Sequence, residues 1–222
     1  MSQLSMFAAD ASPAELTDVA GLLAAHGQSG LGDSGASISI VVDEHWRAVA
    51  LAAILDEAGI GGTISEFDGS SSTGRIGSTG STGIENKRHD DPGTRYTFST
   101  ERTRALAGLV RQWRKGAVKA VPDDWTPTAG QLRVWVLAAG RSVASSSFGL
   151  GIDEALEQHA PQRDALLGAL QRAGLTATYV RTRGSGPLLR ITSAKRLNRL
   201  AESVGARPDG VPVEAWPAPA LR

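Results

Sequence analysis

The sequence predicts an α+β protein in which one unit of helices and antiparallel strands occurs twice. A succession of helix, strand, helix, strand, strand and helix runs from Ser12 to Lys115, and the same succession returns from Thr126 to Val204. Corresponding helices end in similar residues. The main difference in length between the copies falls between two strands, where a structural repeat accepts insertions.

Each copy begins with a helix whose start is marked by proline. Ser12-Pro13-Ala14-Glu15 has the composition of a capping box with Ser12 as N-cap, and Thr126-Pro127 opens the corresponding helix. Apolar residues continue to Gly27 in the first copy and to Gly140 in the second. Glycine at these points predicts the ends of both helices.

An alternating strand follows each of these helices. Ser37–Val42 and Ser147–Ile152 place their apolar residues on one face, which predicts one face toward the core and one free face. The glycines that precede Ser37 and Val143 leave room for one further short strand in each copy.

The second helix of each copy ends in Leu-x-x-Ala-Gly followed by an apolar residue. Gly59 and Gly174 stand where a left-handed C-cap is expected. Two strands and a last helix then complete each copy. The last helices are predicted over 101–115 and 194–204.

This order divides the chain into four parts, which are a leader at 1–11, a first repeat at 12–120 that contains a Gly/Ser-rich loop at 68–93, a second repeat at 121–206, and a proline-rich tail at 207–222. In the second repeat the connection that corresponds to the loop is a turn at 183–186. Gly/Ser/Thr-rich segments without aromatic residues behave as linkers. The tail is expected to dock or fray.

Composition limits the classes of function. The 222 residues carry a formal net charge of +0, so attraction to a polyanion has to come from local patches. The chain has no cysteine, which excludes disulfides, thiolate zinc sites and thiol catalysis. It shows no signal-peptide pattern and no apolar run of ~20 residues, and a soluble cytoplasmic protein is therefore expected.

The junction between the copies, Arg111–Val143, resembles the central region of LAGLIDADG homing endonucleases in their single-chain, two-repeat form. Trp113, Gly116, Lys119, Val121 and Pro122 match the basic stretch that ends the first repeat, and Leu132, Trp135 and Gly140 match the helix that follows. In the family this helix closes on an acidic pair. Ala138 and Ala139 stand at that pair in this chain.

The resemblance implies a saddle with pseudo-two-fold symmetry, in which the first helices of the two repeats pack against each other. Small residues that could allow this approach are Ala20, Gly21, Ala24, Ala25, Ala138 and Ala139. They could instead simply end ordinary core helices.

In the family, the acids at the ends of these helices bind divalent metal ions over the scissile phosphates. Alignment of the helices puts His26 and Ala139 at the metal-binding positions, and neither suits magnesium. The resemblance therefore implies degenerate catalytic motifs with no confident catalytic residue, no metal and no cofactor.

Asp33 offers a weak alternative acid. Leu31-Gly32-Asp33-Ser34-Gly35 resembles another form of the family motif, although Gly27 and Gly30 would interrupt a helix before it reached Asp33. Mg²⁺ would be needed only if this nuclease alternative held. Asp123 and Asp124 precede the second central helix, where carboxylates favour the helix dipole, and a structural role is expected for them.

The family reads DNA bases from outward-facing strand positions in the major groove. Alternation along the predicted strands selects as candidates Ser39, Arg95, Thr97, Arg181, Arg183 and Arg190. Arginine addresses guanine edges bidentately, and Ser and Thr contact bases or phosphates. The loop adds Arg75, Lys87 and Arg88, where a flexible arm could follow the DNA backbone. For each residue the alternative is a solvated surface charge or hydroxyl.

Three functions follow, each tied to a different observation. The leading hypothesis is a sequence-specific double-stranded DNA-binding protein that has lost cleavage, monomeric with internal pseudo-two-fold symmetry, as a regulator or the remnant of a mobile element. The alternative is a divergent homing endonuclease with an asymmetric metal site. The third is a protein-interaction module, which the neutral net charge favours.

Overall fold

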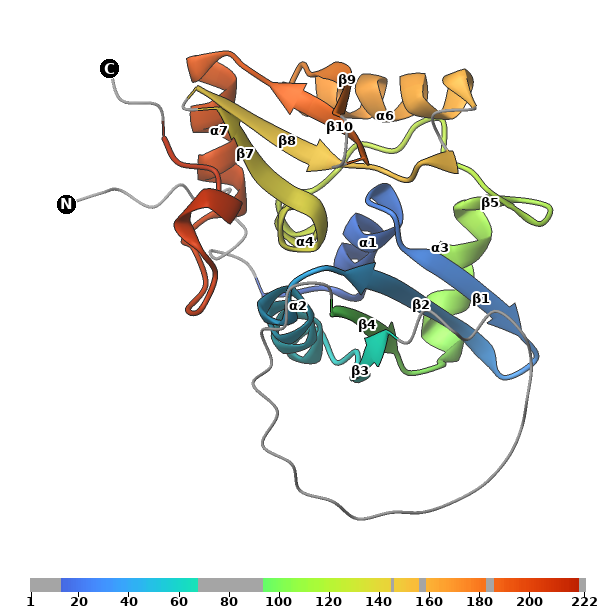
Figure 1. Cartoon of the computed structure of the whole chain (residues 1–222). Coiled ribbons are helices and arrows are strands. Elements are labelled where there is room, and N and C mark those ends of the chain that lie inside the picture. The colour runs from blue at the N-terminus through green and yellow to red at the C-terminus, as the bar shows by residue number, and fades with distance from the viewer. Residues whose placement is uncertain (1–12, 68–93, 145, 156–158, 183–185, 220–222) are drawn as a thin grey trace.

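The computed structural model describes residues 13–67, 94–144, 146–155, 159–182 and 186–219 (Figure 1). The first half contains η2 (Leu16–Val19), α1 (Ala20–Ala24), β1 (Gln28–Gly32), β2 (Gly35–Val42), α2 (His45–Glu57), β3 (Gly62–Phe67), β4 (Arg95–Thr100), η3 (Arg104–Leu106) and α3 (Ala107–Gln112). A short hairpin of β5 (Arg114–Lys115) and β6 (Val118–Lys119) follows. The second half contains α4 (Ala129–Ala139), β7 (Gly140–Ala144), β8 (Ser147–Gly151), α6 (Ala160–Arg172), β9 (Thr178–Thr182), β10 (Gly186–Ile191), α7 (Ala194–Val204) and η4 (Val213–Ala215).

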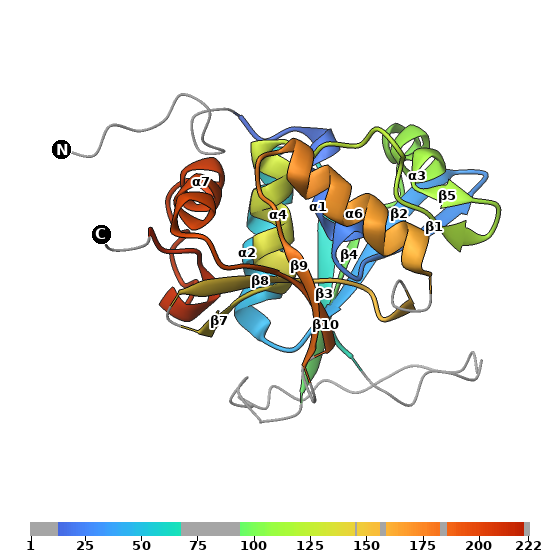
Figure 2. The same ribbon diagram turned by 90° about the horizontal axis from the view of Figure 1, so that it is seen from above.

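The two halves form sheets of the same topology. The strand order is β1-β2-β4-β3 in the first sheet and β7-β8-β10-β9 in the second, and every pairing in both sheets is antiparallel. Helices α3, α6 and α7 lie on one side of the molecule, and β3, β4, β9 and β10 reach toward the opposite side (Figure 2). The predicted α+β fold with a duplicated helix-and-sheet unit is confirmed.

The centre of the molecule is the packing of α1 against α4 (Figure 2). A Cβ added at Gly21 would stand 2.3 Å from the Gln131 carbonyl oxygen and 2.8 Å from the Trp135 backbone nitrogen. The two helix backbones therefore approach as closely as glycine alone allows. The expected role of a small residue at this interface is confirmed for Gly21. One hydrophobic core continues from the first half into the second across it.

The central helices start later than the sequence predicts. Ser12 lies outside the described residues, and Glu15 is the N-cap of η2, with a capping box completed by Asp18. In the second half the N-cap is Thr128, two residues after the expected Thr126, and Gln131 completes its box. The prolines therefore predicted correctly that a helix begins nearby, but each helix begins later in the chain than the proline indicated.

The two capping boxes also bond to each other. Thr128 Oγ1 donates to Asp18 Oδ1 at 3.4 Å, and Gln131 Nε2 donates to the Thr17 carbonyl oxygen at 3.1 Å. Burial raises the pKa of Asp18, while a hydrogen bond from the Glu15 amide opposes that rise. The same residues thus start both helices and join the halves.

Several other elements lie where the sequence places them. The further strands before β2 and β8 exist, and Gly59 and Gly174 adopt φ values of +72° and +77° after α2 and α6. Helix α7 has the predicted bounds, whereas α3 is shorter than predicted because its first turn is a 3-10 helix and the chain leaves it for the unexpected β5–β6 hairpin. Gly116, with φ of +66°, makes the turn of that hairpin.

The tail docks in the part that is described. Trp216 is buried, its indole nitrogen donates to the Gly205 carbonyl at 3.2 Å, and the Arg133 guanidinium lies 5.2 Å from its ring centroid. Within the described residues, no helix is long and apolar enough to cross a membrane.

Candidate functional site

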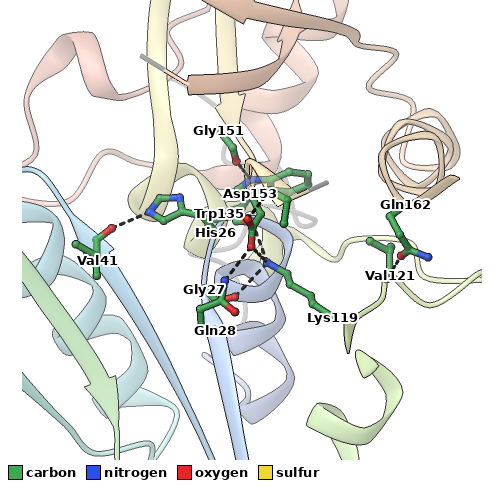
Figure 3. Close-up of polar contacts among 12 residues, drawn as sticks. His26, Gly27, Gln28, Val41, Lys119, Val121, Trp135, Gly151, Asp153 and Gln162 are labelled. Carbon is green, nitrogen blue, oxygen red and sulfur yellow. Dashed lines mark hydrogen bonds and ion pairs between the residues drawn. The ribbon is translucent and has the colours of Figure 1, made fainter. Parts of the chain in front are cut away.

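The ends of α1 and α4 carry the residues that the sequence aligns with metal-binding acids, and Figure 3 shows the first of them, His26, with its neighbours. The Nε2–H of His26 donates to the Val41 carbonyl oxygen of β2 at 2.7 Å. Ala139 ends α4 with its methyl group against Gly151 of β8, where an added Cβ would stand 3.0 Å from the Ala139 Cβ. Both positions are therefore used for packing a helix end onto a strand.

Burial decides the charge of His26. Desolvation lowers the pKa of its imidazole, and the bond to the Val41 carbonyl and the nearby Asp153 and Asp43 only partly oppose this effect. The imidazole is thus neutral at pH 7, and its donating nitrogen is occupied by the backbone. In the second half, Trp135 Nε1 makes the equivalent bond to the Gly151 carbonyl oxygen at 2.9 Å.

A largely buried lysine holds the end of α1. Lys119 Nζ donates to the carbonyl oxygens of Ala25 at 3.2 Å and Gly27 at 3.1 Å, and lies 3.5 Å from Asp153 Oδ2 (Figure 3). Gln28 Nε2 donates to the same carboxylate oxygen at 2.9 Å. Burial lowers the pKa of Lys119 to about 8, although Asp153 acts in the opposite direction. A cation here satisfies carbonyls that a helix end leaves without partners.

A buried arginine holds the end of α4. The Arg47 guanidinium donates to the carbonyl oxygens of Leu137 at 2.8 Å and Gly140 at 2.9 Å. Its Nε donates to Glu44, and the group lies 4.4 Å from the centroid of the Trp46 ring. Arg47 is only 8% exposed, so it is a structural cation that comes from α2.

These residues do not fit a divalent metal ion. Magnesium requires several oxygen ligands, but the two helix ends present an imidazole bonded to backbone, an alanine methyl and two buried cations. The carboxylate of Asp153 is already held by Lys119 and Gln28. No group of three or more His, Cys, Asp or Glu that could hold a metal occurs among the described residues.

The alternative acid does not reach this site. Asp33 lies in the turn between β1 and β2, since the strands pair as a hairpin that closes at Gly32 and Gly35. The interpretation of this segment as the end of a helix is therefore wrong. Asp123 and Asp124 are exposed in the loop before α4. Arg172 binds this loop through the backbone oxygens of Asp123 and Trp125. The structural role expected for the two carboxylates stays a prediction.

The outer face of the first sheet is rich in hydroxyl groups. The alternating burial of β2 and β4 and the pairing of β3 with β4 place on this face Ser37, Ser39, Thr63, Ser65, Thr97 and Ser99. Arg95 shares the face at the start of β4. The predicted positions of Ser39, Arg95 and Thr97 on one face are confirmed.

The outer face of the second sheet differs in composition. Arg190 pairs with Gly149, and Arg141 pairs with the same glycine from the other side, so the two arginines share this face. Leu188 and Val143 approach the Gly149 Cα between them. The Arg190 Nε is buried and has no hydrogen-bond partner among the described residues.

Arg181 lies on the opposite face of that sheet. Two residues apart in β9, Arg181 and Tyr179 lie on the same face of the sheet, and the Tyr179 ring is 4.9 Å from the Arg163 guanidinium of α6. The register pairs Arg181 with Pro187. The expectation that Arg181 and Arg190 share the outer face is therefore wrong by one residue of alternation. Arg75, Lys87, Arg88 and Arg183 lie outside the described residues.

A basic segment was missed by the sequence reasoning. Between residues 102 and 119 there are six basic residues and no acidic one, namely Arg102, Arg104, Arg111, Arg114, Lys115 and Lys119. Arg102 lies over the outer face of the β1–β2 hairpin, where it donates to the Gly35 carbonyl at 3.1 Å and stands near Gly30 and Gly32. Arg111 and Arg114 line a depression with Leu31 and Gly116. The absence of acidic residues over this length was the available signal.

Comparisons with known proteins agree on the fold. The sequence matches no family model and no curated protein. The structure is similar to that of the homing endonuclease I-WcaI bound to its DNA recognition sequence, with a TM-score of 0.57 and 12% identity over 92% of this chain and 84% of that chain. It is also similar to full-length DUF199/WhiA from Thermatoga maritima, with a TM-score of 0.50 and 13% identity over 86% of this chain.

The chain spans 55% of the WhiA chain that it matches. At these identities the likeness shows the fold, and the chain has the duplicated helix-and-sheet saddle of LAGLIDADG proteins. The resemblance drawn from the junction of the repeats is thus confirmed for the architecture.

Proposed function

We propose that the protein binds double-stranded DNA in a sequence-specific manner as a monomer and does not cleave it. The observation that carries this proposal is the combination of the DNA-reading architecture with helix ends that are closed by Arg47 and Lys119. A monomer suffices because both sheets of the saddle come from one chain.

DNA binding is supported by the fold and by local charge. I-WcaI, which shares the fold over most of its length, is bound to its DNA recognition sequence. In this protein, the hydroxyl-rich face of the first sheet lies between Arg95 and the Arg102 guanidinium. Ser and Thr hydroxyls contact bases or phosphates, and arginines contact guanine edges or phosphates. The basic segment supplies positive charge that the neutral total conceals.

Loss of cleavage is supported by the chemistry of the helix ends. A divalent ion placed there would meet two fixed cations and a carboxylate, that of Asp153, which Lys119 and Gln28 already bind, and the neutral imidazole of His26 is a poor ligand for magnesium. Phosphodiester hydrolysis by metal ions needs hard oxygen ligands that position the attacking and leaving oxygens. Arg47 and Lys119 instead bind the carbonyl oxygens at the ends of the two helices.

The test is selection of bound duplexes from a random DNA pool with the purified full chain. We expect enrichment of one site, which stays intact when the complex is incubated with magnesium or manganese. Cleavage of the selected site would overturn the loss of activity. Failure to enrich any sequence at low salt would overturn DNA recognition and favour a protein-interaction module.

A matched pair of variants sharpens the test. Ser39→Ala removes one hydroxyl from the outer face of β2, whereas Ser203→Ala removes one from α7, on the helical side of the molecule. We expect Ser39→Ala alone to change the selected sequence or weaken binding to it. Equal behaviour of the two variants would argue against base reading by this face.

A further inference from the structure

A cavity of about 900 Å³ lies on the side of the first half away from the β1–β2 hairpin. Its walls come from α2, from the start of β4, from α4 and from the turn Pro208–Gly210 of the tail. Small-molecule sites in proteins measure about 300–1,000 Å³ and have mainly apolar walls. The cavity therefore has the size of a site for a small organic molecule.

The floor of the cavity is apolar and comes mainly from α2. Trp46, Val49 and Ile54 line it together with Leu137 of α4. Ala53, also in the lining, leaves room where a larger side chain would fill it. Val49 is 46% exposed, so this face of α2 has no covering element within the described residues.

The rim of the cavity is acidic. The lining contains four carboxylates, those of Asp43, Glu44, Glu57 and Asp209. The cations Arg47 and Arg141 partly balance the charge of Asp43 and Glu44. Neither Glu57 nor Asp209 forms an ion pair with any residue that the structure describes.

The one arginine in the lining is bound to the tail. The Arg133 guanidinium donates to the carbonyl oxygens of Val204 and of Ala206, the latter at 2.8 Å, and lies 5.2 Å from the centroid of the Trp216 ring. It keeps its charge, but the four carboxylates of the lining outnumber it. The balance of charge in the lining therefore favours a cationic ligand.

We propose that this cavity binds a small organic cation with an apolar body, such as an aryl-alkyl ammonium. The apolar part would cover Val49, Ala53 and Ile54, and the ammonium group would lie against one of the two carboxylates of the lining that form no ion pair, Glu57 or Asp209. Trp46 and Tyr96 also line the cavity, but Arg47 lies over the Trp46 ring and His45 packs against the Tyr96 ring, so the carboxylates are the groups that favour a cation. This site does not depend on DNA binding.

The cavity also adjoins the end of α4. Glu44 and Leu137 line it, and the same residues hold Arg47, through the Glu44 carboxylate and the Leu137 carbonyl.

The test uses 2-phenylethylammonium as the probe, with 2-phenylethanol as its neutral analogue and 3-phenylpropionate as the anion, followed by NMR of methyl-labelled alanine and valine in the full chain. We expect saturable shifts at Val49 and Ala53 in the millimolar range that fits a probe of this size. Binding of the ammonium should be at least about tenfold tighter than that of the alcohol. The anion should not bind.

Variants locate the site. Ala53→Trp fills the cavity and should abolish the shifts at Val49, whereas Ala117→Trp, in the exposed turn of the β5–β6 hairpin, should leave them unchanged. Glu57→Gln combined with Asp209→Asn should remove the advantage of the ammonium and keep the weak binding of the alcohol. Equal affinity for all three probes, or shifts that persist in Ala53→Trp, would overturn the proposal.

Discussion

The ends of α1 and α4 are equivalent in the fold but are held by different cations from different parts of the chain. Lys119 reaches the end of α1 from the β5–β6 hairpin, and Arg47 reaches the end of α4 from α2. Lysine can lose its proton when it is buried, whereas arginine remains charged. A cation therefore binds each helix end in both halves, but the halves differ in the element that supplies it and in whether it can lose its proton.

The outer faces of the two sheets also differ between the halves. The outer face of the first sheet carries hydroxyls at six positions of β2, β3 and β4, whereas the second carries Gly149 and Leu188 between Arg141 and Arg190, with Thr178 of β9 on the same face. One scaffold thus presents two surfaces with different hydrogen-bonding capacity. We expect the halves to contribute unequally both to stability and to DNA binding.

The largest expected difference between the halves concerns two glycines of the central helices. In Gly21→Ala the new methyl group would stand 2.3 Å from the Gln131 carbonyl oxygen, so backbone has to move, and we expect a loss of about 3–4 kcal/mol. In Gly130→Ala it would stand 2.3 Å from the Asp18 carboxyl group, which is a side chain and can turn away. We expect a loss of about 1 kcal/mol there, from weakened capping.

Urea unfolding of both variants measures this difference. Gly108→Ala is the control, because nothing lies within 4 Å of its added Cβ and alanine favours the helix by up to about 1 kcal/mol. A loss at Gly21 no larger than that at Gly130 would show that the helix backbones move apart as easily as the Asp18 side chain turns away, and would contradict the expected difference between backbone and side-chain contact.

The second contrast concerns the two caps. Arg47→Met leaves the Leu137 and Gly140 carbonyls without their donors, and we expect a loss of about 3 kcal/mol at pH 7. For Lys119→Met we expect a smaller loss of stability, about 1–2 kcal/mol, because removing the lysine also removes the cost of burying its charge. Asp153 keeps its bonds from Gln28 and from the Ala155 amide. A larger loss for Lys119→Met in urea unfolding would reverse the order of the caps.

The architecture could be predicted from the sequence because it depends on local sequence patterns. Gly59 and Gly174 mark left-handed helix ends through their own backbone conformation, and α7 carries its apolar period within its bounds. The caps were not accessible, because Arg47 and Lys119 contact carbonyls about ninety residues away in the chain. No pattern of spacing encodes such a contact before the fold is known.

The candidate site was accessible only in part. Ser39 and Thr97 could be assigned to the outer face because β2 and β4 alternate clearly between buried and less buried residues. In β9, the neighbouring residues Tyr179 and Val180 could each face the core, so the sequence did not decide on which face of the sheet Arg181 lies. The pairing of β9 with β10 settles it.

A third contrast uses pH to separate the caps. The pKa of Lys119 is lowered from 10.5 in its ordinary environment to about 8 in the folded protein. Between these values the unfolded chain binds more protons than the folded one, so the free energy of unfolding rises with pH through this window. The contribution is at most about 1.4 kcal/mol per pH unit for one proton. Below pH 8 it is constant.

Urea unfolding at a series of pH values from about 7.5 to about 10 measures this slope, because the series lies between the folded and the unfolded pKa of the lysine. The difference between the wild-type chain and Lys119→Met isolates the group from other lysines and tyrosines. Arg47→Met should keep the slope, since the guanidinium does not titrate there. An identical pH dependence in the wild type and Lys119→Met would show that Lys119 keeps its ordinary pKa.

The smallest expected effect compares one arginine from each half in DNA binding. Arg102 is exposed over the β1–β2 hairpin and we expect it to contact phosphate, whereas Arg190 is half buried and its Nε is shielded from solvent. Arg102→Ala should weaken binding to the selected duplex about fivefold and reduce the dependence of log affinity on log salt by about one. Arg190→Ala should weaken binding only about twofold, because less of its charge is available. Anisotropy titrations at several salt concentrations measure both, with Arg199→Ala as the control, because the guanidinium of Arg199 on α7 lies beside Gly174 at the end of α6. A larger loss in Arg190→Ala would transfer the main grip on DNA to the second half, and the hydroxyl-rich face would then serve only to position the duplex.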